Sequence, residues 1–186
     1  PTSGTCGEHV TWSLSEDGTL TISGTGEMED YDGSESFPKW DRDLIQNIVI
    51  ESGVTSIGDN AFCGVDHLKS IDIPEGVTRI GEEAFWACDN LETVTLPDSL
   101  EEIGESAFAN CGKLQKIALP KNVKTLGDTV FWRCFGLTDF VVDSENTVFS
   151  AKDGVLFNKS GTKLLAYPEG NARTSYTIPE GVTSID

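Results

Sequence analysis

The sequence lacks long apolar stretches and is poor in basic residues. Its apolar runs, such as residues 48–50 and 140–142, are far shorter than the ~18 residues that a membrane-spanning helix requires. Only 13 Lys and Arg stand against 31 Asp and Glu, which gives a net charge of −18. Nucleic-acid binding requires a basic face, so we expect no nucleic-acid partner. Because the apolar runs are short, we also expect no membrane insertion. Because 38% of the residues are apolar, the chain can still bury a core.

Residues with catalytic or metal-binding chemistry are also scarce. The two histidines, His9 and His67, have no ligand set around them at metal-binding spacing, and we interpret both as surface residues. The stretch from Asp30 resembles part of a calcium loop, but Met28 and Lys39 occupy the expected first and last ligand positions, which favours a solvated acidic loop. Nucleophile-elbow and phosphate-binding glycine motifs are missing. We therefore expect no catalytic residue, no metal and no cofactor.

What the sequence does contain is a repeat. Four stretches align without gaps and start 23 residues apart, at positions 45, 68, 91 and 114. They read IQNIVIESGVTSIGDNAFCGVDH, LKSIDIPEGVTRIGEEAFWACDN, LETVTLPDSLEEIGESAFANCGK and LQKIALPKNVKTLGDTVFWRCFG. A unit this short cannot bury its own apolar face. The units must therefore stack as a solenoid with one continuous core.

The spacing within one unit predicts its local structure. Ile71 and Ile73 alternate as on a strand, which Pro74 ends because proline cannot donate to a ladder. A second short strand is expected before Gly81. Residues 82–88 are predicted to form one helical or 3₁₀ turn, with acidic residues at its N-terminus. The predicted fold class is an α/β repeat solenoid whose parallel strands pair at ~4.8 Å.

The pattern LxxIxIPxxVxxIGxxAFxxCxx closely resembles the BspA-like, or Treponema-type, leucine-rich repeat of secreted and surface proteins. The resemblance covers residues 45–136 and fixes about ten positions per unit. It implies an extracellular or bacterial cell-surface location and a non-catalytic recognition module that adheres to host or bacterial proteins or glycans. A passive spacer that displays another domain is the alternative function. An enzyme would need carboxylates that converge in a cleft, and the acidic pairs of this sequence lie in turns.

The flanks of the repeats differ in composition. Alternating apolar residues on both sides of Asp17-Gly18 predict a β-hairpin, and Phe37 and Trp40 are placed to cover the end of the core. The Ile-Pro pair after Val142 comes 36 residues later instead of 23, and three short apolar runs predict a β-meander in the insertion. The expected divisions are an N-terminal cap (1–44), four repeats (45–136), a degenerate repeat with the meander (137–175) and the start of a truncated further repeat (176–186). We expect the full-length protein to continue beyond this repeat.

Three of the five cysteines share one column of the repeat. Cys88, Cys111 and Cys134 end successive units, and their stacked Cβ vectors would be parallel, which disfavours disulfide geometry. We expect these three to be free, buried thiols. A bridge between Cys6 and Cys63 stays open, and the odd count leaves at least one thiol free.

Two surfaces are candidates for binding. The outward columns of the main sheet hold small and mixed residues without an aromatic, which makes that face bland. The column after the Phe of each unit places Trp86 and Trp132 two coils, or ~10 Å, apart, with Phe135 close to the second. These three residues are the candidate anchors for a protein or glycan. Burial beneath neighbouring turns and the meander is the favoured competing interpretation, because Trp is usually mostly buried. We expect this chain to be a monomer.

Overall fold

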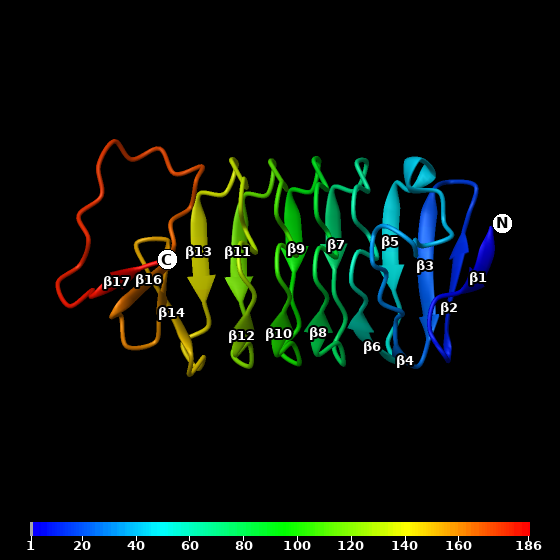
Figure 1. Ribbon diagram of the computed structural model, residues 1–186, viewed down its shortest axis with the longest axis horizontal. Coiled ribbons are helices and arrows are strands. Elements are labelled where there is room, and N and C mark those ends of the chain that lie inside the picture. Colours follow the sequence, from blue (N-terminus) through cyan, green and yellow to red (C-terminus); the bar gives the residue numbers. More distant parts are fainter. Residues whose placement is uncertain (1) are drawn as a thin grey trace.

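Each repeat unit forms one coil of a solenoid, and the coils lie side by side along the long axis of the molecule (Figure 1). The computed structural model describes residues 2–186. The elements are β1 (Ser3–Thr5), β2 (Val10–Leu14), β3 (Thr19–Gly24), β4 (Gly26–Glu27), η1 (Arg42–Leu44), β5 (Asn47–Ile50), β6 (Val54–Ile57), β7 (Ser70–Asp72), β8 (Arg79–Ile80), β9 (Thr93–Thr95), β10 (Glu102–Ile103), β11 (Lys116–Leu119), β12 (Thr125–Leu126), β13 (Asp139–Val142), β14 (Phe149–Lys152), β15 (Val155–Asn158), β16 (Lys163–Ala166) and β17 (Ser184–Ile185).

Two rows of parallel strands run along the solenoid. The first row contains the parallel pairs β3–β5, β7–β9 and β11–β13, and the second contains β4, β6, β8, β10 and β12 in that spatial order. Ile71 lies opposite Val94 and Ile80 lies opposite Ile103, so the pairing keeps the 23-residue period of the sequence. Burial alternates along β5 and β11, as a strand with one face on a core requires.

The third side of each coil is a run of turns that we call the AF segment: residues 58–65, 81–88, 104–111 and 127–134. The helical or 3₁₀ turn expected over residues 82–88 is wrong, because Glu83 and Ala87 have φ angles of 52° and 55°. The N–H groups of Glu83, Phe85 and Ala87 donate to carbonyls of the next coil at 2.8–2.9 Å. The N–H groups of the two residues between them donate instead to carbonyls three residues earlier in the same segment.

This alternation explains why no helix forms. A helix directs every N–H along its own axis, whereas the AF segment directs alternate N–H groups to the neighbouring coil. Each left-handed residue costs roughly 1–2 kcal/mol, which the added hydrogen bonds between coils offset. The fold is thus a β-solenoid rather than an α/β solenoid, and η1 is the only helix within residues 2–186. The described chain contains no helix of sufficient length and apolarity to cross a bilayer.

The core contains a column of stacked aromatic rings. Phe62, Phe85 and Phe108 are fully buried, and their ring centroids lie 5.4 and 5.3 Å apart from coil to coil. Phe131 continues the column at 6.2 Å from Phe108. At the N-terminal end Trp40 stacks on Phe62 at 5.7 Å and closes the column, whereas Phe37 is exposed.

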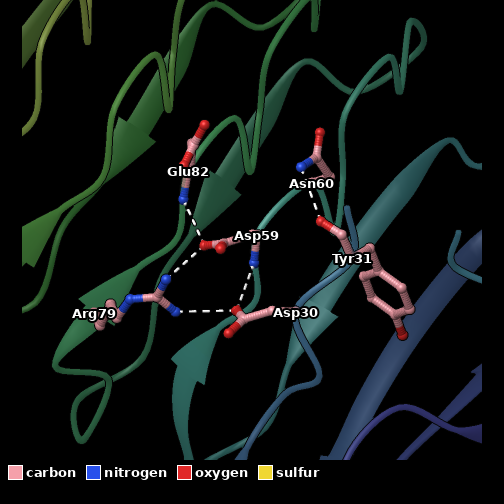
Figure 2. A network of polar contacts seen from close by, with 6 residues as sticks. All are labelled: Asp30, Tyr31, Asp59, Asn60, Arg79 and Glu82. Atoms are coloured by element: carbon pink, nitrogen blue, oxygen red, sulfur yellow. Dashed lines mark hydrogen bonds and ion pairs between the residues drawn. The ribbon is translucent and has the colours of Figure 1, made fainter. Parts of the chain in front are cut away.

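A polar network joins the N-terminal segment to the first two coils (Figure 2). The Asp30 carboxylate accepts hydrogen bonds from the Asp59 N–H at 2.9 Å and from the Arg79 guanidinium at 3.1 Å. The Asp59 carboxylate accepts from Arg79 and from the Glu82 N–H. Beside it, the Asn60 amide donates to the Tyr31 carbonyl at 2.9 Å. These contacts hold the segment before η1 against the AF segments at the N-terminal end of the solenoid.

At the C-terminal end β14, β15 and β16 form an antiparallel meander. The last strand, β17, pairs with β16 in parallel, as the second strands of successive repeats do. Residues 167–170 follow β16 where a fifth AF segment would stand, and the Gly170 N–H donates to the Leu137 carbonyl at 2.8 Å. Strand β12 is the edge of its sheet.

Candidate functional site

Three aromatic side chains in or directly after the AF segments reach solvent, whereas the Phe of each segment lies in the core. Trp86 is 37% exposed, Trp132 52% and Phe135 59%. Burial of the two tryptophans beneath neighbouring turns, the favoured interpretation from the sequence, is therefore wrong. The buried tryptophans are Trp12 and Trp40, at the N-terminal end. Whether the three exposed residues bind a partner stays a prediction.

The two exposed indoles flank a small residue in the same column. The Ala87 N–H donates to the Ala109 carbonyl, and the Asn110 N–H donates to the Trp132 carbonyl, so the three coils are in direct register. Ala109 is fully buried. Trp86 and Trp132 therefore stand on either side of a position without a side chain large enough to separate them.

Arg133 places a cationic side chain beside the second exposed indole. Its guanidinium carbon lies 5.3 Å from the Trp132 ring centroid and 5.7 Å from that of Phe135, within the range of cation–π attraction. The backbone N–H of Arg133 donates to the Glu169 carboxylate at 2.8 Å. We call Trp132, Arg133 and Phe135, together with Trp86, the aromatic cluster. Sequence reasoning missed Arg133, although its place between two aromatic residues was a readable signal.

A groove lies beside the aromatic cluster, between the fourth AF segment and the meander. It has a volume of about 700 Å³, and we call it the slot. Its floor is apolar, and its walls are the fourth AF segment on one side and residues 165–169 on the other. Residues that line it include Leu126, Phe131, Phe140, Leu156, Ala166 and Tyr167. The slot depends on how the meander packs, which no sequence pattern reveals.

A column of carboxylates runs along the AF segments to the rim of the slot. It consists of Asp59, Glu82, Glu105 and Asp128, one from each coil. Desolvation, followed by the charges of Glu105, Asp59 and Glu83, raises the pKa of Glu82. Arg79 compensates the charge at the start of the column through its pair with Asp59. Asp128 lies at the other end of the column and lines the slot.

The other sequence candidates show no sign of a metal site. His9 and His67 are exposed. Asp32 accepts hydrogen bonds from the N–H groups of Ser34, Glu35 and Ser36 of its own loop, which lowers its pKa to about 2. Within residues 2–186 no group of three or more His, Cys, Asp or Glu side chains is arranged to hold a metal ion. The Asp32 carboxylate thus organises its own turn.

All five cysteines are free thiols, including Cys6 and Cys63. The Sγ atoms of Cys88, Cys111 and Cys134 donate to the carbonyls of Phe62, Phe85 and Phe108 at 3.2–3.3 Å. Burial raises the pKa of Cys88 and of Cys134 to about 12, and that of Cys111 well above its usual value. The column thiols therefore fill the core and join adjacent coils.

Thiol reactivity at pH 8 tests this arrangement. Because the thiolate is the nucleophile and burial raises the pKa of the column thiols, we expect a disulfide reagent to modify at most the half-buried Cys63 in the native protein. After denaturation without reductant, all five thiols should react. Rapid modification of two or more native thiols, or fewer than five after denaturation, would contradict the structure.

Comparison with known proteins places these columns in a family. The profile described as "BspA type Leucine rich repeat region" matches residues 34–160 in six copies. The crystal structure of a leucine-rich repeat protein from Eubacterium ventriosum is similar at 30% identity and a TM-score of 0.76. The alignment covers 100% of this chain and 56% of that one. No curated protein matches this chain.

Two further solved structures share the fold at lower identity. The pneumococcal vaccine antigen PcpA is 23% identical with a TM-score of 0.70, over 97% of this chain and 60% of that one. A leucine rich cell surface protein from Faecalibacterium prausnitzii is 22% identical with a TM-score of 0.63, over 98% and 65%. This chain thus spans 56–65% of the length of these three proteins. Because the family profile covers more than half of the sequence and its repeated columns build the core, this chain belongs to the BspA-type leucine-rich repeat family.

Proposed function

We propose that this chain is a non-catalytic recognition module of an extracellular or cell-surface protein, which binds a protein or glycan through the aromatic cluster. The observation that carries the proposal is the exposure of Trp86, Trp132 and Phe135 on a rigid array. Large aromatic and arginine side chains dominate the energy of protein interfaces. Here Arg133 lies between two of the aromatic rings, so the cluster combines both types.

The family supports the location at the cell surface. Among the similar structures, one is named a cell surface protein and another a vaccine antigen, although at 22–23% identity they share only the fold with this chain. The net charge of −18 restricts the class of partner, because this chain repels anionic surfaces within a Debye length of ~8 Å. The partner we propose is neutral or basic.

The alternative function, a passive spacer, would use the solenoid only for its length. The outward face of the main sheet suits that role, since Val49 and Val141 are isolated exposed apolar residues among small polar ones. A spacer has no need of four clustered aromatic and cationic side chains on another face. The aromatic cluster therefore favours recognition.

Binding of the purified chain to immobilised collagen, fibronectin, laminin and the basic glycoprotein lactoferrin, with heparin as the anionic comparison, tests the proposal. We expect the wild type to bind at least one of the four proteins and not heparin at physiological salt. The double change Trp86→Ala and Trp132→Ala should weaken that binding at least tenfold, because both anchors are lost. Thermal unfolding followed by circular dichroism should be nearly unchanged, since both indoles reach solvent.

The matched control is Val49→Ala with Val141→Ala, which removes exposed apolar atoms from the sheet face instead. It should bind as the wild type does. Equal binding by the wild type and the double tryptophan variant would move the site away from the aromatic cluster. If the wild type bound none of the four proteins, the result would favour the spacer function.

A further inference from the structure

Trp86 and Trp132 leave the solenoid from stretches of backbone with the same conformation. In both coils the tryptophan N–H donates to the carbonyl three residues earlier at 3.0 Å. Each tryptophan also lies between two left-handed residues with φ angles of 52–59°: Glu83 and Ala87 for the first, Thr129 and Arg133 for the second. Because the backbone sets the direction of a side chain, the two indoles are attached in parallel. The aromatic cluster therefore contains two equivalent anchors.

The ladder between coils sets the spacing of these anchors. Trp86 belongs to the second coil and Trp132 to the fourth, so their points of attachment are about 10 Å apart along the solenoid axis. Rings of the buried Phe column rise by 5.3 and 6.2 Å over the same two steps. Ala109 stands between the anchors and is fully buried, so its methyl group does not project between the indoles. Backbone hydrogen bonds on both sides of Ala109 hold this arrangement before any ligand binds.

A ligand that uses both anchors must offer two equivalent faces at the spacing of two coils. In an extended β-1,4-linked chain of pyranose sugars, each ring is turned over relative to the ring before it. Alternate rings therefore present the same face, and the chain repeats over nearly the length of two coils. The C–H groups on a sugar face pack favourably on the negative face of an indole. An α-1,4-linked chain winds into a helix and does not keep alternate rings in one line.

Polar groups beside the anchors can bind the hydroxyl groups of such a chain. Asn110 follows Ala109, is half-buried, and has a side-chain amide that both donates and accepts hydrogen bonds. The guanidinium group of Arg133 lies over the rings of Trp132 and Phe135, beside the second anchor. The net charge of −18 opposes glycans that carry carboxylate or sulfate groups. Together these features favour a neutral glycan.

We infer that the aromatic cluster binds a neutral β-1,4-linked glycan, with alternate sugar rings stacked on Trp86 and Trp132. This inference rests on the proposed recognition function and names its class of ligand. A protein ligand fits less well, because the surface of a folded protein does not repeat with the period of the coils. Since the anchors are already in place, little conformational entropy is lost when the glycan binds.

Titrations with cellohexaose, chitohexaose and mannohexaose, followed by tryptophan fluorescence, test the inference. All three are neutral β-1,4-linked chains. Maltohexaose is the matched comparison for cellohexaose, because both contain six glucose units and only the linkage differs. Trp12 and Trp40 are buried, so a change in emission on binding reports the two exposed indoles. We expect saturable binding of at least one β-1,4-linked hexaose and at least tenfold weaker binding of maltohexaose.

Variants of the anchors test the stacking and its spacing separately. Trp86→Ala should weaken binding of the hexaose at least tenfold, and Trp86→Phe should restore part of the loss, because it returns a flat ring. The double change Ala109→Trp with Trp132→Ala keeps two exposed indoles but places them one coil apart, and it should also weaken binding at least tenfold. Phe37→Ala removes an exposed ring at the N-terminal end and should bind as the wild type does. Thermal unfolding followed by circular dichroism checks that each variant is folded.

Three results would overturn the inference. The first is that none of the β-1,4-linked hexaoses binds at its highest soluble concentration. The second is equal affinity for maltohexaose. The third is undiminished binding by Trp86→Ala or by the folded double variant with indoles one coil apart. If the chain bound one of the four immobilised proteins through its tryptophans but none of the hexaoses, the recognition function would stand and its ligand would be a protein.

Discussion

The substitution Phe108→Ala should lower the free energy of unfolding by about 3–5 kcal/mol, as measured by denaturant unfolding followed by circular dichroism. Phe108 is fully buried, and its ring lies 5.3 Å from that of Phe85 and 6.2 Å from that of Phe131. The coils above and below are held at fixed spacing by backbone hydrogen bonds on three sides. The two coils cannot move inward to fill the cavity left by the ring, so most of the free-energy cost of that cavity is retained.

The control for this prediction is Phe135→Ala. It removes the same atoms from a side chain that is 59% exposed, and we expect it to change the free energy of unfolding by less than about 0.5 kcal/mol. If the two variants unfolded at the same denaturant concentration, the aromatic column would not be the core of the solenoid.

The substitution Gly104→Ala should destabilise the protein by about 3 kcal/mol although it adds only one methyl group. A Cβ at this position would lie 2.6 Å from the backbone nitrogen of Glu82 and 2.7 Å from the carbonyl carbon of Gly81. Both atoms belong to the neighbouring coil and cannot rotate away. Relief of the contact requires the second and third coils to separate, which weakens the hydrogen bonds of the AF segments. The measurement is the same unfolding experiment.

Gly112→Ala is the matched comparison, because nothing lies within 4 Å of a Cβ built there. It should be neutral or slightly stabilising, since alanine reduces the entropy of the unfolded chain. Equal stability of the two variants would show that the glycines at this position of the repeat do not mark a close approach between coils.

The period of the repeat made the register predictable. With columns of identical type 23 residues apart, only one stacking places every Phe on a Phe and every Gly on a Gly. Ile71 opposite Val94 follows from that alignment. The strand β7 (Ser70–Asp72) was likewise readable, because its side chains alternate between core and solvent irrespective of which coil lies next to it.

The AF segment was not predictable in the same way. Its acidic residues followed by Ala-Phe are typical of a helix N-terminus, and local propensity alone favours that interpretation. The left-handed angles at Glu83 and Ala87 are stable only because a neighbouring coil accepts the N–H groups that these angles direct toward it. A single unit of the sequence contains no trace of that partner.

By itself the sequence determined the solenoid, its period, the residues of its core and the acidic character of its surface, because each of these depends on composition or on a pattern repeated in every coil. The tertiary structure alone decided the backbone of the AF segments, the exposure of Trp86 and Trp132, and the slot beside the fourth coil. These depend on which atoms of a neighbouring coil or of the meander are present to cover a side chain or accept an N–H. Such contacts join residues far apart in the chain, and they form only when the coils stack.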